Sequence, residues 1–97
     1  MYAVTFDIDT NCIKSQFEDI NIQNDIYGKI RKFMTENGFE WKQGSVYFGN
    51  DSINAVTCVT TVQKLAKAIP ALSVCVKDIR MLKIEEYNDY YQLFNSN

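Results

Sequence analysis

Asp7 is the first residue of this chain whose type and position could do chemistry. It lies in the opening segment Tyr2 to Ile8, where large apolar residues alternate with smaller or polar ones. This alternation predicts a half-buried strand and places Asp7 near its C-terminal end, on the face opposite the large residues. A carboxylate there could act as a general acid or base. If a two-fold axis brings Asp7 close to its symmetry mate in a dimer, the two carboxylates could instead share a proton or hold a divalent cation such as Mg²⁺ at the interface. The alternative is a solvated acid, or a cap for the following loop.

Two further candidates follow a glycine turn in the middle of the chain. In the segment Gln43-Gly44-Ser45-Val46-Tyr47, Ser45 and Tyr47 are two residues apart and so share one face of a short strand. A hydroxyl and a phenol beside such a turn could contact a phosphate and stack a nucleobase. An ordinary hairpin turn followed by a strand aromatic is the alternative.

The segment Lys77-Asp78-Ile79-Arg80 is the third candidate. Asp78 and Arg80 share one face of the last predicted strand, where Arg80 could bind a phosphate bidentately while Asp78 orients it. The alternative is an ion pair that fixes strand register. Basic residues elsewhere are dispersed, and Lys42 is the one among them that we predict to contact a nucleic acid.

Composition limits the chemistry that these residues can perform. The chain has no histidine, so histidine-dependent triads and histidine-type ribonuclease mechanisms are excluded. The net charge of −2 is unlike that of a non-specific duplex-DNA binder. Three widely spaced cysteines fit neither a disulfide framework nor a zinc site, and we expect small buried or half-buried thiols. Without a signal peptide or an apolar run long enough to span a bilayer, we expect a cytoplasmic protein.

The elements that must position the candidates follow a strand–helix–strand–strand–helix–strand order. Strand patterns cover residues 2–8, 39–42, 45–48 and 72–84, helical spacing covers 20–37 and 52–69, and residues 10–19 read as a loop. This order predicts an α+β fold: a ferredoxin-like βαββαβ sandwich with a four-stranded antiparallel sheet and two helices on one face.

Ninety-seven residues predict a single domain over 1–97. The last predicted strand carries apolar residues on both faces, so we expect the face without helices to be covered by a second copy in a homodimer. The C-terminal tail, residues 86–97, is rich in tyrosine and is expected to dock on that dimer as a short helix or edge strand.

The motif Asp7-Ile8-Asp9-Thr10 is similar to the nucleophile motif of haloacid-dehalogenase-type phosphatases, but 97 residues are too few for that fold. A different resemblance spans nearly the whole chain. The opening strand with Asp7, the block from Gly38 to Tyr47 and the block from Ser73 to Arg80 together resemble the VapD (virulence-associated protein D) family of small bacterial endoribonucleases.

That family is similar in fold to the small integration-associated nuclease of CRISPR systems, a ferredoxin-like homodimer. The resemblance implies metal-assisted or metal-sensitive cleavage of single-stranded RNA, with toxin-like or persistence roles, and it leaves an antitoxin partner open. It implies that Asp7, Ser45 and Asp78 are catalytic, with Asp7 also a ligand of Mg²⁺. It further implies that Tyr47 and Arg80 bind RNA.

Two hypotheses follow from these observations. The first is a dimeric endoribonuclease, and the second is a non-enzymatic ferredoxin-like dimer that serves as a nucleic-acid-binding or assembly module. The acidic pI of about 5.0 favours the second, whereas the three ordered blocks favour the first, which is our interpretation.

Overall fold

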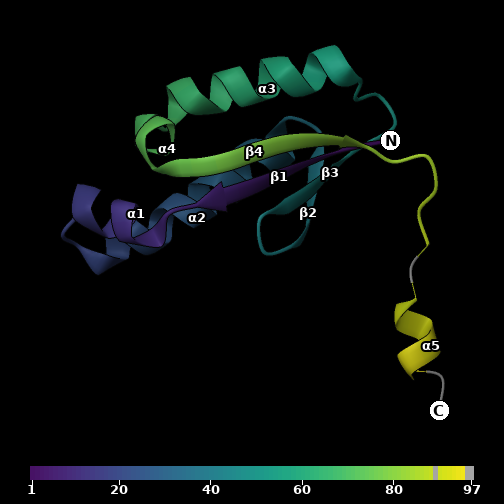
Figure 1. Ribbon diagram of the computed structural model, residues 1–97, viewed down its shortest axis with the longest axis horizontal. Coiled ribbons are helices and arrows are strands. Elements are labelled where there is room, and N and C mark those ends of the chain that lie inside the picture. The colour runs from purple at the N-terminus through teal and green to yellow at the C-terminus, as the bar shows by residue number, and fades with distance from the viewer. Residues whose placement is uncertain (89, 96–97) are drawn as a thin grey trace.

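The computed structural model describes residues 1–88 and 90–95. Its centre is a four-stranded sheet with the strand order β2-β3-β1-β4, in which every neighbouring pair is antiparallel (Figure 1). The strands are β1 (Tyr2–Ile8), β2 (Phe39–Gln43), β3 (Val46–Gly49) and β4 (Val76–Lys83). The helices are α1 (Thr10–Gln16), α2 (Ile20–Glu36), α3 (Ala55–Ala68), α4 (Pro70–Cys75) and α5 (Tyr91–Asn95). The predicted ferredoxin-like α+β fold is confirmed.

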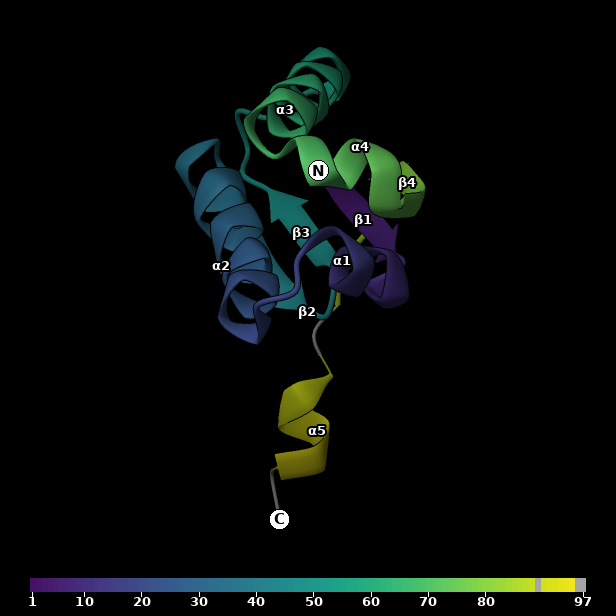
Figure 2. The ribbon, with the colours of Figure 1, turned by 90° about the vertical axis from the view of Figure 1, so that its left-hand side faces the viewer.

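The two long helices, α2 and α3, cover one face of the sheet (Figure 2). Buried residues on α2 recur every four positions, at Ile26, Ile30 and Met34, because one stripe of the helix faces the core. From the sheet, Val4 and Tyr47 enter the same core. Both helices fall within about three residues of the predicted ranges. Among the described residues, no helix is long and apolar enough to cross a membrane.

Residues 10–16, predicted as loop, are helical, so that part of the prediction was wrong. The carboxylate of Asp9 accepts a hydrogen bond from the Cys12 N–H at 3.1 Å and caps α1. Only Ile13 is buried in this short helix. A single buried position produces no apolar periodicity, which is why the sequence pattern indicated a loop.

The last strand was predicted to begin at residue 72, but residues 70–75 form α4 and β4 begins at Val76. Pro70 occupies the first turn of α4, where its missing N–H costs nothing. Leu72 and Cys75 are buried three positions apart, a helical spacing in an apolar segment that also resembles a strand.

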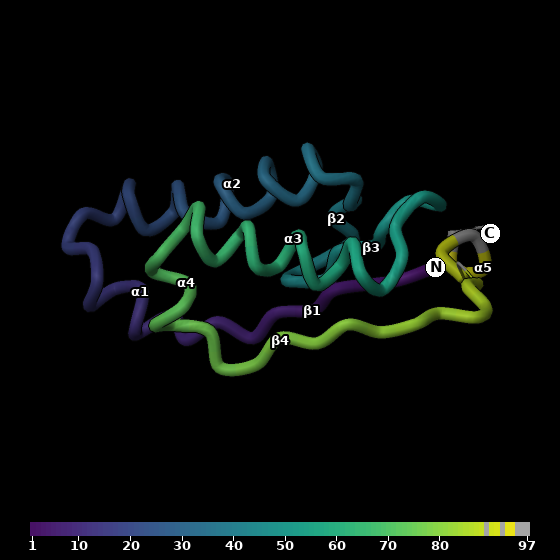
Figure 3. Tube along the Cα trace, turned by 90° about the horizontal axis from the view of Figure 1, so that it is seen from above, coloured from purple at the N-terminus to yellow at the C-terminus, as the bar shows by residue number. Residues whose placement is uncertain are grey.

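A disulfide joins Cys12 in α1 to Cys75 at the end of α4, with a Cα–Cα distance of 5.3 Å. The expectation of three thiols is therefore wrong for this pair and confirmed for Cys58, which is buried and not bonded. Sequence distance concealed the pair, because 63 positions separate the two cysteines. Seen from above, α1 and α4 lie at the same end of the sheet, where β1 ends and β4 begins (Figure 3).

The C-terminal tail leaves the sheet after β4. Tyr87 packs edge-on against Phe48, with ring centroids 5.3 Å apart. The predicted short helix is present as α5, which lies apart from the sheet and from the other helices (Figure 1). Residues 89, 96 and 97 of the predicted docking segment lie outside the described part of the chain.

Candidate active site

Three of the predicted site residues lie together on the sheet face that carries no helix. Asp7 in β1 is the direct register partner of Asp78 in β4, and both are exposed. Directly opposite residues of an antiparallel pair point to the same side, about 4.5–5.5 Å apart at Cβ. Arg80 shares this face, and its Nε lies 2.8 Å from Oδ2 of Asp78. The result is a two-carboxylate site with one neighbouring guanidinium.

The site lies where the sheet becomes narrower. The pairing of β1 with β3 reaches Phe6, whose N–H donates to the Ser45 carbonyl at 3.0 Å, and extends no further among the described residues. Pairing with β4 continues through a bulge between Asp7 and Ile8. Bulges commonly redirect side chains beside active sites. Asp7 is therefore approachable from the side that β3, which begins at Val46, leaves uncovered.

The donor set of this site suits a magnesium ion only in part. Mg²⁺ is commonly bound by one or two carboxylates together with water and substrate phosphates, and Asp7 and Asp78 supply two. Among the described residues, no cluster of three or more His, Cys, Asp or Glu could hold a metal ion. Further ligands would therefore have to come from water or substrate.

Ser45 and Tyr47 lie on the opposite side of the sheet from Asp7. Tyr47 is the register partner of Val4 and is buried with it among the helices. Its ring meets Phe6 edge-on, with centroids 5.9 Å apart. Ser45, half-buried, precedes β3. Both line one cavity, so the prediction that they share a face is confirmed, but that face is not the face of Asp7.

Burial raises the pKa of the Tyr47 phenol, and this effect outweighs the opposing hydrogen bond and positive charge of Arg31. A raised pKa keeps the hydroxyl protonated near neutral pH. Tyr47 can therefore donate a hydrogen bond, but it is unsuited to act as a general base.

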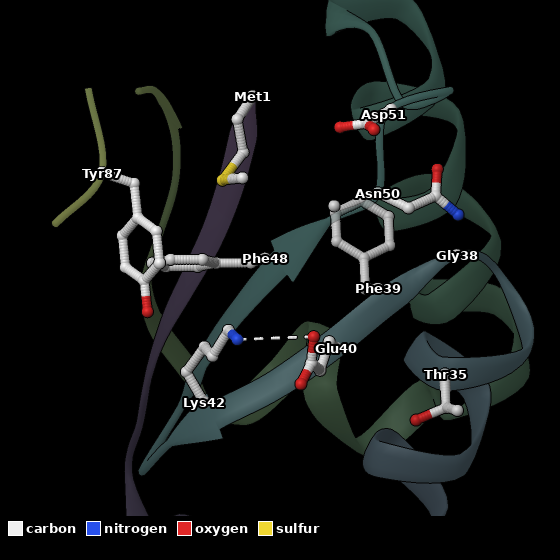
Figure 4. Close-up of a pocket in the computed structure, with 11 residues that line it drawn as sticks. Met1, Thr35, Gly38, Phe39, Glu40, Lys42, Phe48, Asn50, Asp51 and Tyr87 are labelled. Carbon is white, nitrogen blue, oxygen red and sulfur yellow. Dashed lines mark ion pairs between the residues drawn. The ribbon is translucent and has the colours of Figure 1, made fainter. Parts of the chain in front are cut away.

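Lys42 is also separated from the acidic pair. Its Nζ lies 3.4 Å from Oε2 of Glu40 and above the rings of Phe48 and Tyr87, at 5.5 and 5.9 Å from their centroids (Figure 4). It lines a hollow of about 400 Å³ near the N-terminal end of β1. The register places Lys42 level with Val4 and Thr5, but in β2, which β3 separates from the strand that carries Asp7.

The structure also brings together residues that sequence reasoning missed. The Arg31 guanidinium in α2 lies over the Trp41 ring in β2, with Cζ 3.7 Å from the ring centroid. Tyr27, one turn before Arg31, lines the same cavity as Ser45 and Tyr47. Tyr27 and Arg31 are four positions apart on a predicted helix, and residues at this spacing share one helix face. That spacing was the signal in the sequence that could have grouped the two residues.

The antiparallel sheet with both long helices on one face places this protein in the class of ferredoxin-like α+β proteins. Asp7, near the end of β1, lies on the open face of that sheet. Residues 1–90 match the family model described as CRISPR associated protein Cas2, and the chain belongs to that family. It is 64% identical over 89 residues to the Endoribonuclease VapD homolog of Helicobacter pylori (strain ATCC 700392 / 26695), which covers 92% of this chain and 90% of the relative.

Two further relatives carry similar names. The chain is 57% identical to Endoribonuclease VapD 2 of Riemerella anatipestifer over 92% of its length and 94% of the relative's. It is 37% identical to Endoribonuclease VapD of Dichelobacter nodosus over 93% and 92%. The predicted resemblance to VapD proteins is confirmed.

Proposed function

We propose that this protein is an endoribonuclease that cleaves single-stranded RNA at the site of Asp7, Asp78 and Arg80. One observation carries the proposal: Asp7 and Asp78 face each other on the open side of the sheet. The relatives named Endoribonuclease VapD, at 64% and 57% identity over more than 90% of this chain, support the reaction type.

Asp7 is the proposed acid–base group, because the chain has no histidine to fill that role. As a general base, it would accept the proton of the attacking water or 2′-hydroxyl as that oxygen bonds to the phosphorus. The P–O bond to the neighbouring nucleotide then breaks, and the departing oxygen takes a proton from solvent. Arg80 would bind the phosphate, and Asp78 would orient Arg80 through their 2.8 Å ion pair. Mg²⁺, if held by Asp7 and Asp78, would stabilise negative charge on the phosphate.

Ser45, Tyr47 and Lys42 are proposed to contact RNA outside this group. The predicted catalytic role of Ser45 requires a substrate that passes the start of β3, because Ser45 lines a cavity on the helix side. Tyr47 is buried and serves as a hydrogen-bond donor or ring contact at that cavity. Lys42 would contact a phosphate over β2 and β3, away from the acidic pair.

A homodimer is part of the proposal. Exposed apolar side chains on α5 and the adjoining tail support it, since Tyr90 and Phe94 are 60% and 83% exposed. A second copy would cover them if residues 86–97 dock across the interface. An antitoxin partner is proposed from the family resemblance, and a cytoplasmic location is a further part of the proposal. Sedimentation equilibrium tests the dimer, and a monomer at micromolar concentration would contradict it.

The second candidate function is a non-enzymatic nucleic-acid-binding or assembly module. The pairing of Arg80 with Asp78 favours it, because a guanidinium engaged by a carboxylate is less available to phosphate. The net charge of −2 points the same way.

Cleavage of a 5′-labelled single-stranded RNA separates the two functions. We expect wild type to cut and Asp7→Asn to be at least about 100-fold slower, the usual minimum effect of losing a general base. Asp51→Asn, another exposed aspartate, is the matched control and should cut like wild type. Parallel reactions with Mg²⁺ and with EDTA test the metal. Equal cutting by wild type and Asp7→Asn would reject the role of Asp7, and no cutting by wild type would favour the module.

A further inference from the structure

A cavity on the helix side of the sheet is distinct from the acidic pair. It has a volume of about 270 Å³ and lies between α2, the C-terminal half of β1 and the β2–β3 hairpin. We call it the Arg31–Trp41 pocket, and its side chains of interest are Phe6, Tyr27, Arg31, Trp41, Ser45 and Tyr47. Ligand pockets for drug-sized molecules measure about 300–1,000 Å³. This pocket therefore matches a single small ring system.

Trp41 is held in a fixed position while remaining 39% exposed. Its indole Nε1–H donates to the Gly44 carbonyl at 2.7 Å, and the Arg31 guanidinium covers one face of the ring. A tryptophan that is oriented by its neighbours and still accessible loses little conformational entropy when a ligand binds. Arg31 itself provides a second flat, cationic surface on which a base can stack.

The chemistry of the walls favours a nucleobase with an attached phosphate. Four aromatic side chains line the pocket, and stacking on such rings is the usual means of holding an unpaired base. Arg31 is cationic, and Ser45 and Tyr47 each bring a hydroxyl. Among the described residues that line the pocket, there is no carboxylate to repel a phosphate. The open face is different in character, since Asp7 and Asp78 both lie there.

The pocket and Asp7 lie on opposite sides of the same strand. Phe6 and Ile8 line the pocket, and Asp7 lies between them in sequence with its side chain directed to the other face. Because β3 begins at Val46, it leaves this end of β1 uncovered on one side. A single strand of RNA could pass around that edge, with one base on the helix side and its neighbouring phosphate beside Asp7.

We propose that the Arg31–Trp41 pocket binds one unpaired nucleobase of the RNA, next to the phosphate that reaches Asp7. This proposal deepens the proposed endoribonuclease function and rests on it for the identity of the substrate. It also gives a reason for selecting single-stranded RNA, because a paired base within a duplex cannot enter a pocket of this kind.

Trp41 is the one tryptophan of the chain, so its indole N–H is a specific probe in a ¹H–¹⁵N correlation spectrum. We would titrate the full-length protein with AMP and, separately, with ribose 5-phosphate. We expect AMP to shift the Trp41 indole resonance saturably and ribose 5-phosphate to cause little shift. Equal shifts from both compounds would overturn the base site in favour of a phosphate site. No shift of Trp41 with AMP would also overturn it.

Arg31→Gln and Lys32→Gln form a matched pair, because they remove the same charge from neighbouring exposed positions of α2. We expect Arg31→Gln to weaken AMP binding about tenfold, from the loss of stacking and cation–π contact. Lys32→Gln should bind like wild type. Equal affinities of the two variants for AMP would show that Arg31 has no part in binding. That result would overturn the proposal that the Arg31–Trp41 pocket binds the base.

Binding in the Asp7→Asn background separates this proposal from the proposed function. AMP should still shift Trp41 there, because Asp7 lies on the other face of β1. If wild type binds AMP at Trp41 but cuts no RNA, the base pocket stands and the nuclease proposal fails. If wild type cuts RNA but AMP leaves Trp41 unchanged, the nuclease proposal stands and the base pocket fails.

Discussion

Asp7 and Asp78 face one another across the β1–β4 ladder, next to a bulge in the pairing. Like charges in directly opposite positions destabilise an antiparallel pair. Arg80 lies at 2.8 Å from Asp78 and offsets part of the repulsion. The remaining negative charge of this site would be balanced by a bound cation. The same two carboxylates that serve the proposed function therefore lower the stability of the strand pair.

Asp7→Asn should therefore stabilise the fold while it removes activity. The substitution abolishes the cross-strand repulsion, and we expect the free energy of unfolding to rise by about 0.5 kcal/mol, within the range for one cross-strand pair. Urea denaturation of wild type and Asp7→Asn at pH 7 measures the difference. Asp51→Asn provides the comparison, since Asp51 is outside the strands. A destabilised Asp7→Asn would mean that Asp7 has a structural role.

Asp78→Asn should bind RNA more tightly and cleave it more slowly. Removal of this carboxylate releases Arg80 for phosphate, and we expect affinity to rise two- to fivefold, or ~0.4–1 kcal/mol for an exposed ion pair. Cleavage should fall because Arg80 is no longer oriented. Fluorescence anisotropy with a labelled single-stranded RNA in EDTA measures binding apart from turnover. Asp25→Asn, which opens the exposed ion pair with Lys29 on α2, should leave the affinity unchanged.

The sequence was sufficient to predict the fold and the open-face position of Asp7. Period-two alternation in residues 2–8 and four-residue spacing on α2 are strong signals, because each element buries one side. α1 and α4 were missed for the opposite reason. Each is short, and α1 depends on a cap from Asp9 and a covalent bond rather than on an apolar stripe.

The candidate site could be predicted only in part, because strand parity is visible in a sequence but tertiary neighbours are not. Asp78 and Arg80 were placed on one face correctly. The cross-strand partner of Asp7 depends on register, and the stacking of Arg31 on Trp41 depends on how α2 packs against β2. Neither relationship has a local signal, so both required the folded structure.

Reduction of the Cys12–Cys75 disulfide should destabilise the domain. The bond closes a loop across 63 positions, and the loss of that constraint is expected to cost about 4 kcal/mol in the chain-entropy model. Urea midpoints with and without dithiothreitol measure the effect. Cys12→Ala should unfold at the same midpoint in both conditions, whereas Cys58→Ala should retain the sensitivity, because Cys58 is outside the bond. Identical urea midpoints for oxidised and reduced wild type would show that the disulfide contributes nothing to the stability of the fold.

Tyr47 should make stability fall at alkaline pH. Its pKa in the folded protein is raised above the ordinary value of 10.0, chiefly by burial, with Arg31 opposing the shift. In the unfolded chain the phenol ionises at its ordinary pKa, so the stabilisation is fully present below pH 10 and is lost as pH rises through the folded pKa. Urea denaturation between pH 8 and pH 11 should show a steeper decline for wild type than for Tyr47→Phe. Tyr90→Phe, at an exposed position, should follow wild type. Parallel curves for wild type and Tyr47→Phe would mean that this phenol titrates alike in the folded and unfolded states.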